Sequence, residues 1–339
     1  MTVEPDRVTV GPLWGGEDLW HRPGENRRWR ESYYFDFADE ASGLAGFTSI
    51  GWRPGRAVLG ATTVVFAPHA TLVARGERPT TSDFPVLDVA GLAYRRVGDG
   101  LGHWHLSYDG PFEAVADPGT RGPTGLIGVS LVPGALEVEF TPTALPVTSS
   151  GGGFEPAFSW HLEQPGRTVG FVTLNSESLD VDGRGERDRS LGPRDWVHFD
   201  WWLYLAGHVG ELSFNTWTLG RPDDTVVGTG WIQRAASDPE PLTQWSFGPQ
   251  SRLDVGPGGW VPEVLAFSLE APGASVSGTV ESTRLVALDF TTRAGSGTLH
   301  RGVGRMDVGG QEGWGQVEYQ QRTTAPGPPE ARWRAHLPM

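Results

Sequence analysis

The feature that most constrains the fold is a two-residue alternation of apolar and polar side chains, with almost no helical periodicity. In residues 136–140 the apolar side chains point one way and the two glutamates the other, as in a half-buried strand. Similar strand-like runs occupy residues 61–66, 71–74, 168–174, 264–269, 276–280 and 285–290. Turns rich in Gly, Pro and Asp separate them at short spacing, so the chain is predicted to be all-β, with antiparallel strands in a sandwich or barrel.

The length allows two domains of ordinary size. The 339 residues are 38% hydrophobic and 20% charged, as in a globular protein, and the 48 glycines and 27 prolines are dispersed along the chain. The stretch 143–154, which contains TSSGGG, is the most linker-like segment. We therefore predict an N-terminal domain at 1–165 and a C-terminal domain at 166–339.

Charge and missing residue types exclude several function classes. The formal charge is −14, from 41 acidic and 27 basic residues, which argues against nucleic acid or an anionic membrane as a partner. All basic residues are arginine, so a Walker-type phosphate loop and a Schiff-base lysine are excluded. The lack of cysteine excludes disulfides and thiolate chemistry. We expect no cofactor and no metal.

The remaining composition favours a hydrophobic small molecule as the partner. The 15 tryptophans exceed ordinary usage, and such an excess often lines cores and ligand cavities.

The start MTVEPDRVTVGPLW lacks a basic segment followed by an apolar run, and no 18-residue apolar stretch occurs. We expect no signal peptide, no membrane span and a cytoplasmic location. The oligomeric state stays open.

Two histidines have a spacing found in some metal sites. His103 and His105 would share one strand face, a spacing used by cupin metal sites. A cupin also needs a nearby glutamate, but the next acids, Asp109 and Glu113, lie in turn-like sequence. We interpret the two histidines as surface or rim residues.

The densest polar constellation runs from residue 161 to residue 202. Arg187-Asp188 and Arg194-Asp195 lie seven residues apart around a Gly-Pro corner. In a structural interpretation, bidentate Arg–carboxylate pairs lock this corner. In a functional one, a buried Asp188 or Asp195 moves a proton while an arginine polarises a substrate carbonyl.

The next stretch has two distinct faces if it is extended. Trp202 and Tyr204 would share a face with residues 196, 198 and 200, whereas Trp201, Leu203 and Leu205 would form an apolar face. A face that mixes aromatic and polar groups suits a ligand cavity. The alternative is that this face belongs to an ordinary protein core in which the polar atoms of the rings are hydrogen-bonded.

The segment HLEQPGRTVG…LDVDGRGERDRSLGPRDW resembles the two-domain lipocalin-like family of hydroxyneurosporene synthase, a carotenoid 1,2-hydratase, and of lipocalin-like Diels–Alderases. The stretches ESYYFDF…GWRP, WHLSYDGP and GWGQVEY are similar to the same family. The resemblance implies two lipocalin-like barrels packed together, with a ligand cavity at or between them. The family motif Arg-Asp-His-Ser-Trp-Gly is matched by Arg187 to Gly192, with Arg189 at the histidine position and Leu191 at the tryptophan position. Because arginine does not shuttle protons near neutral pH, this change weakens the hydratase interpretation.

Three functions are open. The leading hypothesis is a cyclase that holds a hydrophobic polyketide or isoprenoid polyene for ring closure in secondary metabolism, with [4+2] cycloaddition as one form. The alternatives are an acid-catalysed isoprenoid hydratase or cyclase and a non-catalytic binding protein. The candidate catalytic residues are Asp188, Arg189, Asp195 and Glu163. The candidate substrate-binding residues are Tyr34, His161, Arg187, Arg194, Trp196, Trp202, Trp217, Trp314 and Glu318.

Overall fold

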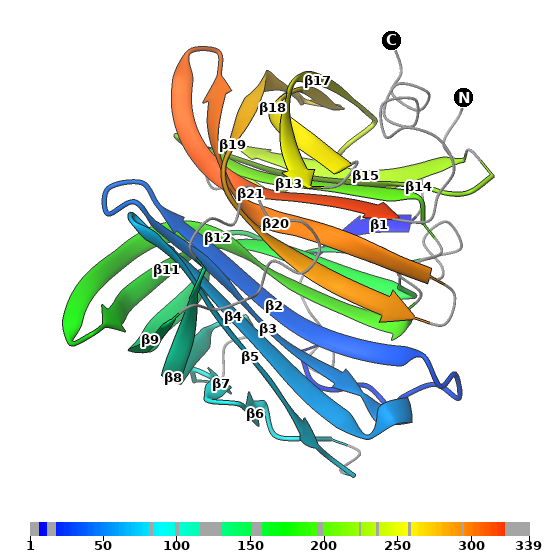
Figure 1. The fold of residues 1–339 in the computed structure, drawn as a ribbon. Coiled ribbons are helices and arrows are strands. Elements are labelled where there is room, and N and C mark those ends of the chain that lie inside the picture. The colour runs from blue at the N-terminus through cyan, green and yellow to red at the C-terminus, as the bar shows by residue number, and fades with distance from the viewer. Residues whose placement is uncertain are drawn as a thin grey trace. The chain divides into compact units, whose positions relative to one another are not determined.

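The computed structural model consists almost entirely of antiparallel strands (Figure 1). It describes residues 7–11, 18–81, 84–98, 102–115, 130–150, 158–194, 199–223, 225–234, 237–256, 259–292 and 295–322. The chain divides into two compact units between Arg194 and Asp195. Each unit contains one large antiparallel sheet, which confirms the predicted all-β class.

The first unit holds β1 to β12 and one short 3-10 turn, η1. Its elements are β1 (Arg7–Val10), β2 (Trp29–Asp39), β3 (Leu44–Arg53), η1 (Pro54–Arg56), β4 (Val58–Ala67), β5 (Ala70–Pro79), β6 (Asp88–Val89), β7 (Leu92–Arg96), β8 (Trp104–Val115), β9 (Ser130–Pro142), β10 (Val147–Ser150), β11 (Trp160–Leu174) and β12 (Glu177–Pro193).

The sheet of the first unit closes into a barrel. Pairing runs β11-β12-β2-β3-β4-β5-β8, and β9 then pairs with both β8 and β11, which completes the circuit. Short strands β1 and β10 extend one edge beside β11, and β7 and β6 extend another beside β8. Closure leaves these barrel strands without free edges.

The interior of this barrel is packed with aromatic rings. Phe35 lies in edge contact with Tyr94, Trp104 and Phe140, at centroid distances of 5.1, 5.9 and 5.4 Å. Tyr33 extends the cluster, 5.5 Å from Trp104. These rings belong to one buried core, as the alternation of the strands requires. Trp52 and Trp104 are the buried tryptophans of this core, and Trp20 packs against it.

The division of the chain differs from the expected one. Residue 165 lies inside β11, and β11 and β12 form a long hairpin that belongs to the first barrel up to Pro193. Part of the linker-like stretch, residues 147–150, forms β10, which pairs with β1 and β11. The Gly-Pro corner expected around residues 192–193 is the end of strand β12. Pairing of β12 with β2, about 150 residues away in sequence, sets these limits.

The second unit holds nine strands in one sheet. They are β13 (Trp201–Val209), β14 (Leu212–Gly220), β15 (Val226–Arg234), β16 (Glu240–Pro241), β17 (Gln244–Gly256), β18 (Gly259–Ala271), β19 (Ala274–Thr292), β20 (Gly295–Val308) and β21 (Gln311–Arg322). Their order in the sheet is β16-β15-β14-β13-β21-β20-β19-β18-β17.

This second sheet curls around its own core. The Trp245 indole of β17 donates to Thr218 Oγ1 of β14 at 2.9 Å, although β17 and β14 are not neighbours in the sheet. Leu203 of β13 and Leu265 of β18 are fully buried members of the same hydrophobic cluster. The unit is therefore barrel-like, with a core separate from that of the first unit.

The strand predictions made from alternation are confirmed. All seven predicted runs lie within β4, β5, β9, β11, β18 and β19. The predicted apolar face at residues 201, 203 and 205 also lies in the core of the second unit.

Candidate functional site

The candidate residues of β12 fall on two opposite faces of the strand. Arg187 and Arg189 are paired in register with Phe35 and Tyr33 of β2, on the face that looks into the barrel. Asp188 is paired with Glu163 of β11 and with Tyr34, on the other face. Asp188 and Arg189 therefore do not share a site, because successive side chains of a strand point to opposite sides.

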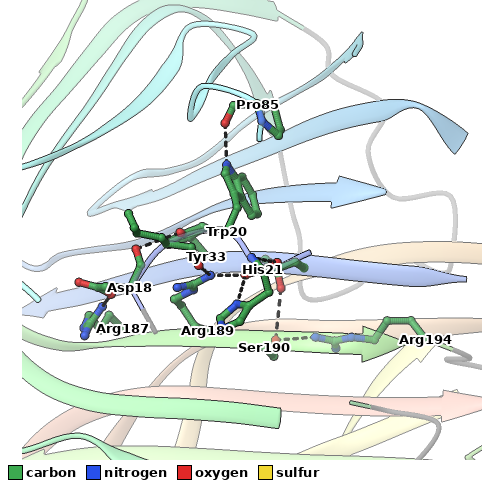
Figure 2. A network of polar contacts seen from close by, with 12 residues as sticks. Asp18, Trp20, His21, Tyr33, Pro85, Arg187, Arg189, Ser190 and Arg194 are labelled. Carbon is green, nitrogen blue, oxygen red and sulfur yellow. Dashed lines mark hydrogen bonds and ion pairs between the residues drawn. The ribbon is translucent and has the colours of Figure 1, made fainter. Parts of the chain in front are cut away.

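On the inner face, Arg187 is held in a buried polar network (Figure 2). Its Nη1 lies 2.5 Å from Asp18 Oδ1, and its Nε donates to Gln164 Oε1 at 2.7 Å. The backbone N–H of Gly102 donates to the other Asp18 oxygen at 3.0 Å. Arg187 and Asp18 have no solvent exposure. This ion pair fixes the segment before β2 to the inside of the barrel.

Arg189 fixes the same segment through a second set of contacts. It forms an ion pair with Glu31, donates to the Leu19 carbonyl at 2.8 Å and covers the Tyr33 ring at 4.1 Å (Figure 2). Glu31 also accepts from the His21 backbone N–H and contacts His21 Nδ1, both at 2.9 Å. Arg189 is thus committed to protein groups, and its placement favours the structural interpretation proposed for these arginines.

Trp20 completes the attachment of residues 18–21. Its indole donates to the Pro85 carbonyl at 2.6 Å (Figure 2). Its ring lies in edge contact with Tyr33 and Trp52 at centroid distances of 4.9 and 5.5 Å. The segment therefore combines buried charge pairs with aromatic packing.

The other face of β11 and β12 carries a cluster of titratable side chains. His161 Nε2 lies 3.1 Å from Glu163 Oε1 and 3.7 Å from Asp188 Oδ2. The side chains of His161 and Glu163 are almost fully buried, whereas that of Asp188 is 23% exposed. Strand pairing brings Asp188 opposite Glu163, with His161 two residues away along β11. A buried imidazole is thus in contact with a carboxylate that reaches solvent.

Arg194 and two serines border this cluster. Arg194 Nη2 donates to Ser190 Oγ, which lies 3.2 Å from Ser32 Oγ on β2 (Figure 2). Burial lowers the pKa of Arg194 to about 10, partly offset by the charge of Asp188. The guanidinium therefore stays protonated at neutral pH. Tyr34, paired with Asp188, is buried with its ring 5.9 Å from Phe47.

The ionisation of His161 should differ from that of a free histidine. Burial acts to lower its pKa, but the Asp188 charge and the hydrogen bond with Glu163 outweigh burial, and the net shift is upward. Arg194 opposes this shift weakly. Protonated His161 therefore contributes stability below about pH 6.5, the unfolded value, and this contribution is lost as pH rises through the folded pKa.

We expect an NMR titration of His161 to show a midpoint above about 6.5. In Asp188→Asn the midpoint should move down, because the carboxylate charge is removed. Urea unfolding between pH 5.5 and pH 9, run on the native protein and on His161→Gln, should show that only the native protein loses the corresponding stability. A native midpoint at or below that of free histidine would contradict this assignment.

In the second unit, aromatic candidates meet on one face of the sheet. Trp202 and Trp217 stack with a centroid distance of 5.9 Å and an interplanar angle of 12°. Tyr204 lies opposite both Trp217 and Glu318 in the strand register and accepts a hydrogen bond from Asn215 at 3.0 Å. The strand register therefore assembles residues that are more than 100 positions apart.

Two further candidates of the second unit can be placed. Glu318 forms an ion pair with Arg301 of the neighbouring strand β20. Trp314 is half-buried and lies opposite His208 and Arg305. Glu318 thus already has a cationic partner within its own sheet.

The remaining predicted residues of both units differ in how far the structure describes them. Asp195 and Trp196 lie outside the described residues. His103 and His105 are partly exposed, and their Nε2 atoms lie 3.5 and 2.8 Å from carboxylate oxygens of Glu139 and Glu137. Among the residues that the structure describes, no three or more His, Cys, Asp or Glu side chains are arranged so that they could hold a metal ion. Within the same residues, no helix is long and apolar enough to cross a membrane.

Asp18, Glu31, Ser32 and Ser190 were not predicted as site residues. Asp18 and Glu31 lie more than 150 positions from their arginine partners, so no local pattern connects them. Alternation alone would have separated Asp188 from Arg187 and Arg189, and would have placed Ser190 beside Asp188.

Together, the fold and the cluster define a two-unit antiparallel β protein with a lipocalin-like barrel and a polar face. The chain belongs to the family described as "Domain of unknown function (DUF7064)", whose model matches residues 16–323. No curated protein has a significantly similar sequence.

Solved structures share this fold. A protein from Nitrosomonas europaea, provisionally named AttH, matches with a TM-score of 0.63 and 14% identity, over 91% of this chain and 98% of its own. Kievitone hydratase from Nectria haematococca matches with a TM-score of 0.55 and 14% identity, over 95% and 98%. CghA matches with a TM-score of 0.50 and 12% identity, over 94% and 99%. These likenesses confirm, at the level of fold, the resemblance to the lipocalin-like hydratase and Diels–Alderase family.

Proposed function

We propose that this protein is an enzyme that binds a hydrophobic small molecule and transfers protons at a carbon–carbon double bond, adding water or closing a ring. The observation that carries the proposal is the contact of buried His161 with partly exposed Asp188. The family histidine is replaced by Arg189, but His161 supplies an imidazole from the neighbouring strand. The proton-transfer chemistry that the motif change removes is therefore available at another position.

The cluster contains one group that can accept a proton and one that can donate a proton. Asp188 reaches solvent and can accept a proton from water or from a substrate hydroxyl as the oxygen–carbon bond forms. Protonated His161 can return a proton to the adjacent carbon, directly or through Asp188. Glu163 holds the imidazole by a hydrogen bond at 3.1 Å and favours its charged form. Added water gives hydration, and an internal hydroxyl gives a ring.

A deuterium experiment tests the proposal. The purified protein would be incubated in D2O with a panel of hydrophobic alkenes that includes kievitone, the compound in the name of one structural neighbour. We expect a product with deuterium bound to carbon, detected by mass spectrometry and located by NMR. Cyclised product without carbon-bound deuterium would contradict proton transfer and identify a purely pericyclic reaction.

A purely pericyclic cyclase is the second candidate. The stacked rings of Trp202 and Trp217 favour it, since flat aromatic surfaces suit conjugated chains. Such a reaction needs chiefly the correct folding of the substrate. Binding without conversion of any compound in the panel would instead support a carrier.

A further inference from the structure

We propose that Arg194 is a positioning residue for proton transfer: its charge balances one of the two carboxylates beside His161, so that the imidazole releases its proton more readily. The inference rests on the proposed function and names a further residue of that site. Arg194 acts through His161, and this role requires no contact between the guanidinium and the substrate.

Two carboxylates approach the same nitrogen of His161. Glu163 Oε1 lies 3.1 Å from Nε2, and Asp188 Oδ2 lies 3.7 Å from it. A protonated imidazole carries a single positive charge, which balances only one of these two carboxylates. Glu163 is almost fully buried, and a buried carboxylate without a compensating cation is costly. The cluster is therefore stable as two ionised carboxylates only if a second cation lies close to it.

Arg194 is the cation that the strands place beside this cluster. Its side chain donates to Ser190 Oγ (Figure 2). Ser190 lies directly opposite His161 in the pairing of β11 with β12, and it shares a face of β12 with Asp188, two residues away. The Arg194 backbone N–H donates to the Arg28 carbonyl at 3.0 Å, which fixes where the side chain begins. The guanidinium is thus held at the edge of the cluster.

The side chains that face His161 come from several strands. β11 itself contributes Glu163, and β12 contributes Asp188. β10 places Ser149, which carries no charge, opposite His161. β2 contributes Tyr34, which is paired with Asp188. The charges that act on the imidazole are therefore those of the two carboxylates and of the arginine that follows β12.

The balance of these charges determines how strong an acid His161 is. Burial lowers the pKa of His161, the carboxylates of Asp188 and Glu163 outweigh burial, and Arg194 opposes the carboxylates. A proton donor is most effective when its pKa lies near the working pH, and an imidazolium between two uncompensated carboxylates would release its proton only at higher pH. Burial lowers the pKa of Arg194 to about 10, so the guanidinium keeps its charge at neutral pH. Arg194 therefore keeps the proton of His161 transferable.

An NMR titration of His161 tests the inference without a substrate. The purified protein would be labelled at histidine, and the His161 signal identified by its loss in His161→Gln. In Arg194→Met the midpoint should rise by about half a pH unit or more, because an opposing charge is removed. Arg194→Lys should keep the midpoint near the native value, because a positive charge remains. An unchanged midpoint in Arg194→Met, or equal shifts in both variants, would overturn the role of Arg194.

Further variants separate the charge of Arg194 from its hydrogen bond and from general effects. Arg194→Gln removes the charge but keeps an N–H donor for Ser190, so its midpoint should rise as in Arg194→Met. It also provides the test if Arg194→Met does not fold, which melting temperatures report. Arg167→Met removes an exposed arginine of β11 whose charge solvent screens, and it should leave the midpoint unchanged.

The outcomes distinguish this inference from the proposed function. If the midpoint rises in the two neutral variants and stays native in Arg194→Lys, but no product gains carbon-bound deuterium, the charge balance stands and the proton-transfer function fails. If deuterium enters the product but the His161 midpoint does not respond to the charge at position 194, the proposed function stands and the role of Arg194 is overturned.

Discussion

Replacing Arg187 with methionine should lower the free energy of unfolding by about 3–5 kcal/mol, because it leaves a buried carboxylate without its cation. Asp18 has no solvent exposure, and its oxygens are held by Arg187 and by the Gly102 backbone. Losing the guanidinium also frees Gln164 Oε1 from its 2.7 Å contact. Urea unfolding followed by tryptophan fluorescence measures the change.

A double-mutant cycle identifies the source of this loss. Asp18→Leu combined with Arg187→Met removes both charges, and replacing a buried ion pair by apolar residues is often neutral or stabilising. The double variant should therefore recover most of the stability that Arg187→Met loses. The matched control is Arg167→Met, whose ion pair with Asp182 is solvent-exposed and should contribute little to stability. Equal effects of Arg187→Met and Arg167→Met would show that the buried network does not anchor residues 18–21.

Asp188→Asn should lower kcat/KM by about 10²- to 10⁴-fold while the protein keeps its fold. The amide keeps the shape of the side chain but neither accepts nor passes a proton at neutral pH. It also removes the charge that favours protonated His161, so both members of the pair are affected. Product formation with the most reactive compound of the alkene panel, in water and in D2O, measures the loss.

Asp182→Asn on the same strand is the control for this variant. Asp182 is exposed and pairs with Arg167, away from the His161 cluster. It should retain native activity. Activity of Asp188→Asn within a few-fold of native would remove Asp188 from the mechanism, and substrate binding measured in parallel would show whether recognition survives.

The candidate site could be predicted only in part from the sequence. The polar constellation from His161 to Trp202 was identified because its residue types are dense and chemically distinctive. Their division into two groups was accessible in principle, since alternation places Arg187 and Arg189 opposite to Asp188. Their partners could not be predicted, because they come from distant parts of the chain. Glu31 lies on β2, whose register against β12 depends on closure of the barrel, and Asp18 lies in the segment before β2.

The sequence by itself determined the all-β class and the positions of several strands, because alternation and turn residues act over a few positions. Only the tertiary structure decided that β11 and β12 belong to the first barrel and that Arg187 and Arg189 hold residues 18–21. It also decided that His161 meets Asp188. The physical reason is that antiparallel register between distant strands depends on the packing of the whole core, which no short segment encodes.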